Sequence, residues 1–140
     1  MNEPSIPACE LCQSEGGETL WHDDFCRVVL VADPDYPGFC RVILNRHVSE
    51  MTDLETGARA RLMRVVFATE AAVRRVMRPD KINLASLGNM VPHLHWHVIP
   101  RYADDRHFPN SVWGEPQRAS AARETPREAI AAALQELLAA

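Results

Sequence analysis

Apolar and polar positions along the chain predict an antiparallel sheet whose strands are interrupted by one long helix. β-like runs of apolar and β-branched residues occur at 19–22, 26–32, 39–44, 82–87 and 94–99. Between the second and third run, residues 33–38 contain two prolines and a glycine, which favours a hairpin-like connection. We therefore expect a sheet of about five strands, built as an antiparallel meander in its first part.

The stretch between the third and fourth run has the pattern of an amphipathic helix. Apolar residues recur at spacings of three and four from Leu54 to Met77, which predicts one buried stripe. Thr52 and Glu55 are placed to form a capping box at the start of this helix. Pro79 cannot continue a helix, so the helix is predicted to end just before it.

The two ends of the chain complete an α+β architecture. Residues 1–17 are rich in turn formers and carry Cys9-Glu10-Leu11-Cys12, which predicts a loop or a single short turn. Residues 101–124 are polar and rich in turn formers, and we expect an ordered loop there. Thr125-Pro126-Arg127-Glu128 combines a capping box with proline at the first helical position, which predicts a C-terminal helix over residues 125–140. Residues 1–140 are expected to form a single domain with the long helix packed on the sheet.

Composition and charge exclude some functions and leave others open. The formal net charge is −4, whereas a broad nucleic-acid surface needs clustered Lys and Arg to displace phosphate counterions. A single small anion can still be held by backbone N–H groups. No apolar run approaches the roughly 18 residues that span a bilayer, and the N-terminus lacks the basic and apolar stretches of a secretory signal. We expect a cytoplasmic protein that binds neither nucleic acid nor membrane.

Three of the six histidines lie within five residues, in His93-Leu94-His95-Trp96-His97. Alternate side chains of a strand face the same way, so a strand here puts the three imidazoles on one face and the large apolar residues on the other. Imidazole titrates close to neutral pH and can act as a nucleophile, a proton donor or a metal ligand. This segment is therefore the main candidate for a reactive site.

Two kinds of chemistry fit three imidazoles on one strand face. In a zinc-dependent hydrolase they bind the metal and leave a position open for water. In phosphorus chemistry one imidazole attacks while its neighbours orient it and protonate the leaving group. Gly88-Asn89-Met90-Val91-Pro92 supplies a turn whose N–H groups can face an anion, and no Asp or Glu lies between Asp80 and Asp104 to serve a hydrolytic zinc. These two features favour phosphorus chemistry.

Residues 93–99 match every position of the signature His-φ-His-φ-His-φ-φ, in which φ is apolar, and the sequence thereby resembles the histidine-triad family. The likeness extends to the Cys9/Cys12 pair, the strand ending near His47, the Asn83 strand, Pro100-Arg101-Tyr102 and Val112-Trp113. The resemblance implies a HIT-like fold and an enzyme, a nucleotidyl hydrolase or transferase acting on dinucleoside polyphosphates or nucleoside phosphoramidates. It also implies a homodimer.

The resemblance assigns roles to the three histidines. His95 is the nucleophile that attacks the α-phosphorus and carries a covalent nucleotide. His97 lies against the scissile phosphate and can assist the leaving group, and His93 orients the site from beside them. Water or another acceptor then takes the nucleotide from His95. This scheme requires no catalytic metal or other cofactor.

The resemblance also implies a set of substrate-binding residues. Gly88 and Asn89 match the turn that holds the α-phosphate oxygens, and Asn83 matches an asparagine near the ribose and phosphate. Asp33 aligns with an aspartate that binds ribose hydroxyls, with a turn aspartate as the alternative interpretation. Trp113 belongs to a C-terminal region that can reach the active site or the partner subunit, with simple packing as its alternative.

Cys9-x-x-Cys12 has the spacing of a thiolate zinc site but supplies only two ligands. Some relatives of the histidine-triad family bind structural zinc with a knuckle of this kind, a histidine like His47 and the first histidine of the triad. The resemblance therefore implies a closed structural zinc site made by Cys9, Cys12, His47 and His93. The alternative is two reduced thiols with no metal.

Two positions depart from the family pattern and keep other functions open. Phe39 follows Gly38 where the family often has a histidine. Met90 stands where many members carry Ser or Thr, and its side chain cannot donate a hydrogen bond to a leaving group. A nucleotide-binding module with little catalysis is therefore one alternative to the enzyme. The other is the zinc-dependent hydrolase that uses the three histidines as ligands.

Overall fold

The strands and helices expected from the sequence are present in the computed structural model, which describes residues 7–139. The elements in chain order are α1 (Glu10–Gln13), β1 (Glu18–His22), β2 (Cys26–Leu30), β3 (Cys40–Leu44), the 3-10 turn η1 (Met51–Asp53), α2 (Thr56–Met77), β4 (Lys81–Ala85), β5 (His95–Arg101) and α3 (Arg127–Leu138). The strands form one sheet in the order β1-β2-β3-β5-β4, and every neighbouring pair is antiparallel. The predicted α+β class is confirmed. Within residues 7–139, no helix combines the length and the apolar character needed to cross a membrane.

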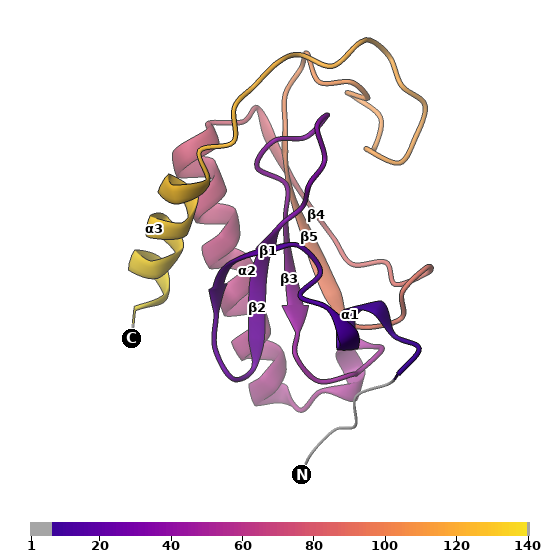
Figure 1. Cartoon of the computed structure of the whole chain (residues 1–140), viewed down its shortest axis with the longest axis vertical. Helices are drawn as coiled ribbons and strands as arrows, with labels where there is room; N and C mark the ends of the chain where they lie inside the picture. The colour runs from indigo at the N-terminus through magenta and orange to yellow at the C-terminus, as the bar shows by residue number, and fades with distance from the viewer. Residues whose placement is uncertain (1–6, 140) are drawn as a thin grey trace.

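One face of the sheet is covered by α2 and α3, and the main core lies between the sheet and these helices (Figure 1). Alternation along β3 separates the two faces of the sheet. Cys40, Val42 and Leu44 belong to this core and are fully buried. Arg41 and Ile43 alternate with them and lie on the opposite face. The predicted packing of the long helix on the sheet is therefore confirmed.

The opposite face carries the N-terminal turn. Leu11 of α1 packs against Val29 and Ile43 in a second, smaller cluster, and Figure 1 shows α1 in front of the sheet with α2 behind it. Arg27 fastens this turn, because its Nη2 donates to the carbonyl oxygens of Leu11 at 2.8 Å and Ser14 at 3.1 Å. Apolar packing and hydrogen bonds to backbone carbonyls thus hold α1 in place.

Residues 102–126 contain no helix or strand, and a buried ion pair fixes the first part of this loop. Arg101, the last residue of β5, donates from Nε to Asp105 at 2.7 Å, and both side chains are 3% exposed. The same guanidinium donates to the Asn83 side chain at 2.7 Å and to the carbonyl of Asn110 at 2.8 Å. These bonds hold the segment that leads to Trp113 against the end of the sheet.

The start of α2 differs from the prediction. The capping box between Thr52 and Glu55 is absent, and Thr52 lies inside η1, where the Glu50 N–H donates to the Asp53 carboxylate at 3.2 Å. Leu54 follows in an extended conformation and is 2% exposed, and α2 begins two residues later. Packing of Leu54 into the core therefore separates the turn from the helix.

The other helix ends agree with the sequence in position but not in capping. α2 ends at Met77, as Pro79 predicts. α3 begins at Arg127, and the predicted capping box between Thr125 and Glu128 is wrong, because α3 has no side-chain cap. The backbone carbonyl of Thr125 accepts the N–H of Arg127 at 2.8 Å instead. A backbone hydrogen bond thus stands at the start of α3, where a bond to the threonine side chain was predicted.

Candidate active site

Strand β5 places two of the three histidines on the face opposite to α2. Trp96 and Val98 pack into the core under α2, while His95 and His97 alternate with them and face the other way. His93 precedes the first residue of β5, and its ring meets that of His47 edge to face with centroids 5.1 Å apart. The expected alternation is therefore present, but His93 points to a different place from the other two.

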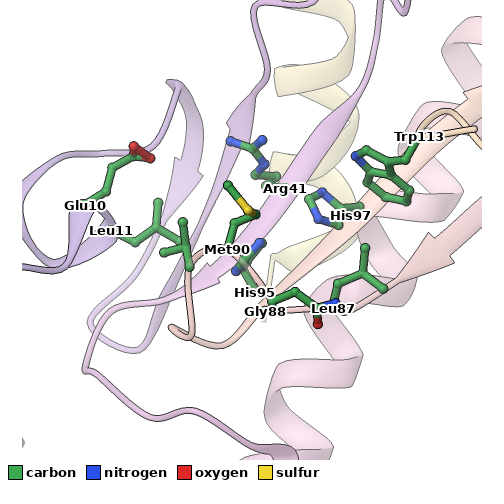
Figure 2. Close-up of a pocket in the computed structure, with 11 residues that line it drawn as sticks. Glu10, Leu11, Arg41, Leu87, Gly88, Met90, His95, His97 and Trp113 are labelled. Atoms are coloured by element: carbon green, nitrogen blue, oxygen red, sulfur yellow. The ribbon is translucent and has the colours of Figure 1, made fainter.

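His95 and His97 line a cavity of about 430 Å³ (Figure 2). Its other walls come from α1, β3, the turn after β4 and the loop after β5, namely Glu10, Leu11, Arg41, Leu87, Gly88, Asn89, Met90, Val91 and Trp113. Figure 2 shows Trp113 beside His97, with Glu10 and Leu11 at the opposite end. Segments far apart in the sequence thus meet around the two imidazoles.

Hydrogen bonding fixes the protonation of the His95 ring. Nδ1 lies 2.6 Å from the backbone carbonyl oxygen of His93, which can only accept, so the proton resides on Nδ1. Nε2 of the neutral ring then carries a free lone pair, as nucleophilic attack requires. Burial lowers the pKa of His95, the bond to His93 opposes this, and the charge of Arg41 lowers it further. The neutral, nucleophilic form is thus favoured.

His97 is enclosed by other rings. Its centroid lies 5.0 Å from those of His95 and Trp113 and 5.6 Å from that of Phe39, all in edge-to-face contact. Nδ1 is buried without a hydrogen-bond partner in residues 7–139, so Nε2 is the nitrogen that can reach a ligand. Burial lowers the pKa of His97 to about 4, and the charges of His95 and Arg41 act in the same direction. His97 is therefore a neutral hydrogen-bonding group near pH 7.

The turn between β4 and β5 lies beside His95. Gly88 has a φ of 76°, a left-handed conformation that side chains disfavour. The backbone N–H groups of Gly88, Asn89 and Met90 donate to no acceptor in the part of the chain that the structure describes. Ser86 Oγ donates to the carbonyl of His95 at 2.7 Å and ties the turn to β5. Unused N–H groups next to the His95 imidazole suit the oxygen atoms of an anion.

His93 completes a compact cluster of four side chains that can bind a metal. Sγ of Cys9 lies 3.3 Å from Nδ1 of His93, and Sγ of Cys12 lies 3.4 Å from Nδ1 of His47 and 3.5 Å from Nδ1 of His93. All four ligand atoms lie within 4.8 Å of one another. A tetrahedral zinc ion, with bonds of about 2.3 Å to sulfur and about 2.0 Å to nitrogen, separates sulfur from nitrogen by about 3.5 Å. The four side chains therefore fit a tetrahedral zinc site.

The three histidines of the signature do not converge on one point. His93 Nδ1 faces the thiols, and its Nε2 lies 2.6 Å from the carbonyl oxygen of Leu44. His95 directs Nδ1 to the His93 carbonyl. Among residues 7–139, the group of side chains placed to share a metal contains His93 but neither His95 nor His97. This geometry disfavours the zinc-dependent hydrolase with three histidine ligands.

Two of the predicted substrate-binding residues lie outside the cavity, while the other three line it. The side-chain oxygen of Asn83 accepts from Arg101 at 2.7 Å. Asp33 Oδ1 accepts from the N–H of Asp35 at 2.9 Å, which is the bonding of a turn aspartate. The structure thus uses Asn83 and Asp33 within the protein itself, and their predicted contacts with ribose stay predictions.

Sequence reasoning missed Arg41 and Glu10 as cavity residues. Arg41 lies directly opposite His97 in the register between β3 and β5. The sequence does contain a signal for Arg41. A lone charged residue interrupts the apolar run Cys40-Arg41-Val42-Ile43-Leu44, and such a residue must face a polar site or solvent. Glu10 comes from a short N-terminal turn whose position depends on distant packing, and no local pattern places it.

Comparison with known proteins assigns the family. Residues 15–104 match the HIT domain family. The chain is 30% identical over 132 residues to AP-4-A phosphorylase of Mycobacterium tuberculosis, a match that covers 89% of this chain and 68% of the relative. Similar solved structures include histidine triad proteins from Bradyrhizobium japonicum (28% identity, TM-score 0.75, 96% of this chain and 99% of that chain) and Marinobacter aquaeolei VT8 (28%, 0.72, 96% and 97%). The chain therefore belongs to the histidine-triad (HIT) family of nucleotidyl hydrolases and transferases.

Proposed function

We propose that this chain cleaves the α-phosphate linkage of dinucleoside polyphosphates or nucleoside phosphoramidates through a covalent nucleotide on His95. The supporting observation is the bond from His95 Nδ1 to the His93 carbonyl, which leaves Nε2 free beside the unused N–H groups of residues 88–90. Substitution at phosphorus needs a nucleophile next to donors that stabilise negative charge. The relative from Mycobacterium tuberculosis is named AP-4-A phosphorylase, so diadenosine tetraphosphate is the first substrate to test.

The proposed reaction consists of two displacements at phosphorus. In the first, the Nε2 lone pair of His95 forms a bond to the α-phosphorus, and the bond from phosphorus to the bridging oxygen or nitrogen breaks. The leaving group keeps the electron pair, and a leaving nitrogen takes up a proton from solvent to depart as an amine. His97, whose ring centroid lies 5.0 Å from that of His95, assists this departure. In the second, water attacks phosphorus and loses a proton to solvent, and the phosphorus–nitrogen bond breaks with its electron pair returning to Nε2. A nucleoside monophosphate is released.

The nucleotide on His95 can be detected directly. The full chain is mixed with diadenosine tetraphosphate, quenched, digested and analysed by mass spectrometry for a nucleotidyl group on the peptide that contains His95. His95→Asn is expected to abolish both the adduct and turnover while AMP still binds. His22→Asn, on the exposed end of β1, is the matched control and should change neither. Unchanged turnover of His95→Asn, or an adduct on another residue, removes His95 from the mechanism.

We also propose a structural zinc ion held by Cys9, Cys12, His47 and His93. Donation from His93 Nε2 to the Leu44 carbonyl leaves Nδ1 without a proton and free to bind a metal. When bound, the ion links the N-terminal turn to the residues just before β5, which adds stability and takes no part in the reaction. Elemental analysis is expected to give about one zinc per chain, lost in Cys12→Ser. Failure of the wild type to retain added zinc contradicts this proposal.

Two further expectations from the sequence belong to this proposal. A homodimer is expected from the family, and light scattering should then give twice the chain mass of 15.7 kDa. The alternative function is a nucleotide-binding module with little catalysis. The quenched reaction separates it from the enzyme, because such a module binds AMP without forming an adduct or turning over either class of substrate.

A further inference from the structure

Arg41 brings a positive charge into the cavity that the two displacements above do not use. It lies on β3 directly opposite His97 on β5, and it lines the cavity together with His95 and His97. Figure 2 shows its guanidinium in the upper part of the view, above Met90.

The hydrogen bonding of Arg41 is incomplete. Its Nε is buried and has no partner within residues 7–139, and its Nη1 reaches the carbonyl of Gly16 only at 3.4 Å. Arg27 and Arg101, which are buried where Arg41 is half-buried, donate from Nε and from both Nη atoms to acceptors of the protein. Enclosed donors without acceptors cost free energy until a ligand accepts them. Arg41 thus differs from the two arginines that serve the fold.

One carboxylate of the protein acts on Arg41 from within the cavity. Burial lowers the pKa of Arg41, and the negative charge of Glu10, another lining residue, opposes this effect. The guanidinium is charged at every accessible pH, and its planar donors match two oxygen atoms of a phosphate. Arg41 is therefore a permanent cation with unused donors, one strand away from the imidazole on the leaving-group side.

We infer that Arg41 binds the phosphate beyond the scissile bond, which makes nucleoside polyphosphates the preferred substrate class over phosphoramidates with an uncharged leaving amine. This inference rests on the proposed function. When the bond from the α-phosphorus to the bridging oxygen breaks, its electron pair stays on that oxygen and the leaving phosphate gains negative charge. The guanidinium of Arg41, which pairs with His97 in the register of β3 and β5 and lines the same cavity, can stabilise this charge with paired hydrogen bonds.

The test compares two substrates that give the same adduct. Diadenosine tetraphosphate has phosphates beyond the scissile bond, and adenosine 5′-phosphoramidate has none. Arg41→Gln is expected to lower kcat/KM for the tetraphosphate by about 10- to 100-fold more than for the phosphoramidate, which is the size of hydrogen bonds to a charged group. Arg41→Lys keeps the charge but not the paired donors, so its kcat/KM for the tetraphosphate should lie between those of the wild type and Arg41→Gln. Arg64→Gln removes the same charge from the exposed side of α2 and is the matched control.

A second readout needs no turnover. Calorimetry measures binding of inorganic tripolyphosphate to the full chain, and Arg41→Gln is expected to weaken it by about 10-fold or more. Glu10→Gln removes the opposing negative charge and should strengthen tripolyphosphate binding. Effects of opposite sign in the two variants cannot come from general misfolding. Equal losses on both substrates, or tripolyphosphate binding that Arg41→Gln leaves unchanged, overturn the inference. If the wild type cleaves neither substrate, the proposed function fails and the tripolyphosphate measurement still decides the role of Arg41.

Discussion

The buried pair of Arg101 and Asp105 gives a quantitative test of how the loop after β5 is held. The Asp105 carboxylate accepts from Nε and Nη2 of Arg101 and from the N–H groups of Tyr102 and Phe108. Burial alone raises the pKa of Asp105, but these bonds outweigh it and lower the pKa from 3.8 to about 2. At about 1.4 kcal/mol per pKa unit, ionised Asp105 contributes about 2 kcal/mol to the free energy of unfolding at neutral pH.

We expect Asp105→Asn to lower the free energy of unfolding by about 3–5 kcal/mol at neutral pH, because it leaves the Arg101 charge buried without its counter-ion. Asp104→Asn is the matched control. Asp104 pairs with Arg123 at the surface, with side chains 61% and 28% exposed, respectively. Such a pair contributes less than about 1 kcal/mol. Urea denaturation followed by circular dichroism gives both values.

The pH dependence of the difference in unfolding free energy between wild type and Asp105→Asn is a second check. The pKa of Asp105 is lower in the folded chain than in the unfolded chain, so its stabilisation is complete above the unfolded value of 3.8 and is lost as the pH falls through about 2. The gap in unfolding free energy between wild type and Asp105→Asn should therefore narrow over this range. A gap below about 1 kcal/mol at neutral pH, or one that stays constant on acidification, refutes the reasoning.

The cavity supports three more predictions. Since the pKa of His97 is about 4, its protonation should lower kcat/KM only as the pH approaches that value, and a loss traced to His97 near the ordinary value of about 6.5 contradicts this. Trp113→Ala removes the edge contact with His97 and should raise KM by about 2- to 10-fold in initial-rate measurements, with a smaller effect on kcat. Gly88→Ala should cost about 1–2 kcal/mol in urea denaturation. The cause is the φ of 76° alone, because the nearest atom to an added Cβ is the Val91 carbonyl oxygen at 3.7 Å, which is an ordinary contact. A much larger loss of unfolding free energy would show a steric clash instead.

The sheet and its two faces could be predicted because alternation is a local property of the chain. His95 and His97 alternate with Trp96 and Val98, and burying the apolar pair against a helix turns the imidazoles to the other side. The start of α2 could not be predicted in the same way. Capping signals compete with tertiary packing. Here the burial of Leu54 in an extended conformation replaces the capping box predicted between Thr52 and Glu55.

The far walls of the cavity depend on contacts between distant segments, which no local pattern encodes. Glu10 is brought in by packing of the N-terminal turn on the sheet, and Trp113 by the loop that Arg101 anchors. Resemblance to the family suggested Asn83 and Asp33 as substrate contacts, yet hydrogen bonds within this chain already involve both side chains. Asn83 lies on β4 and Asp33 in a turn, whereas Gly88 and Asn89, in the turn after β4, do line the cavity, so the kind of element does not decide which of these positions lies there.

His93 explains why the first histidine of the signature matters although it does not line the cavity. Its Nδ1 faces the sulfur atoms of Cys9 and Cys12, while its Nε2 lies 2.6 Å from the Leu44 carbonyl oxygen. A neutral imidazole has one N–H and one lone pair, so donation to Leu44 assigns the lone pair to the thiol side. The backbone carbonyl of His93 in turn holds the proton of His95 on Nδ1 at 2.6 Å. One residue therefore links the N-terminal turn through its side chain, β3 through the Leu44 carbonyl, and the His95 ring through its own backbone carbonyl.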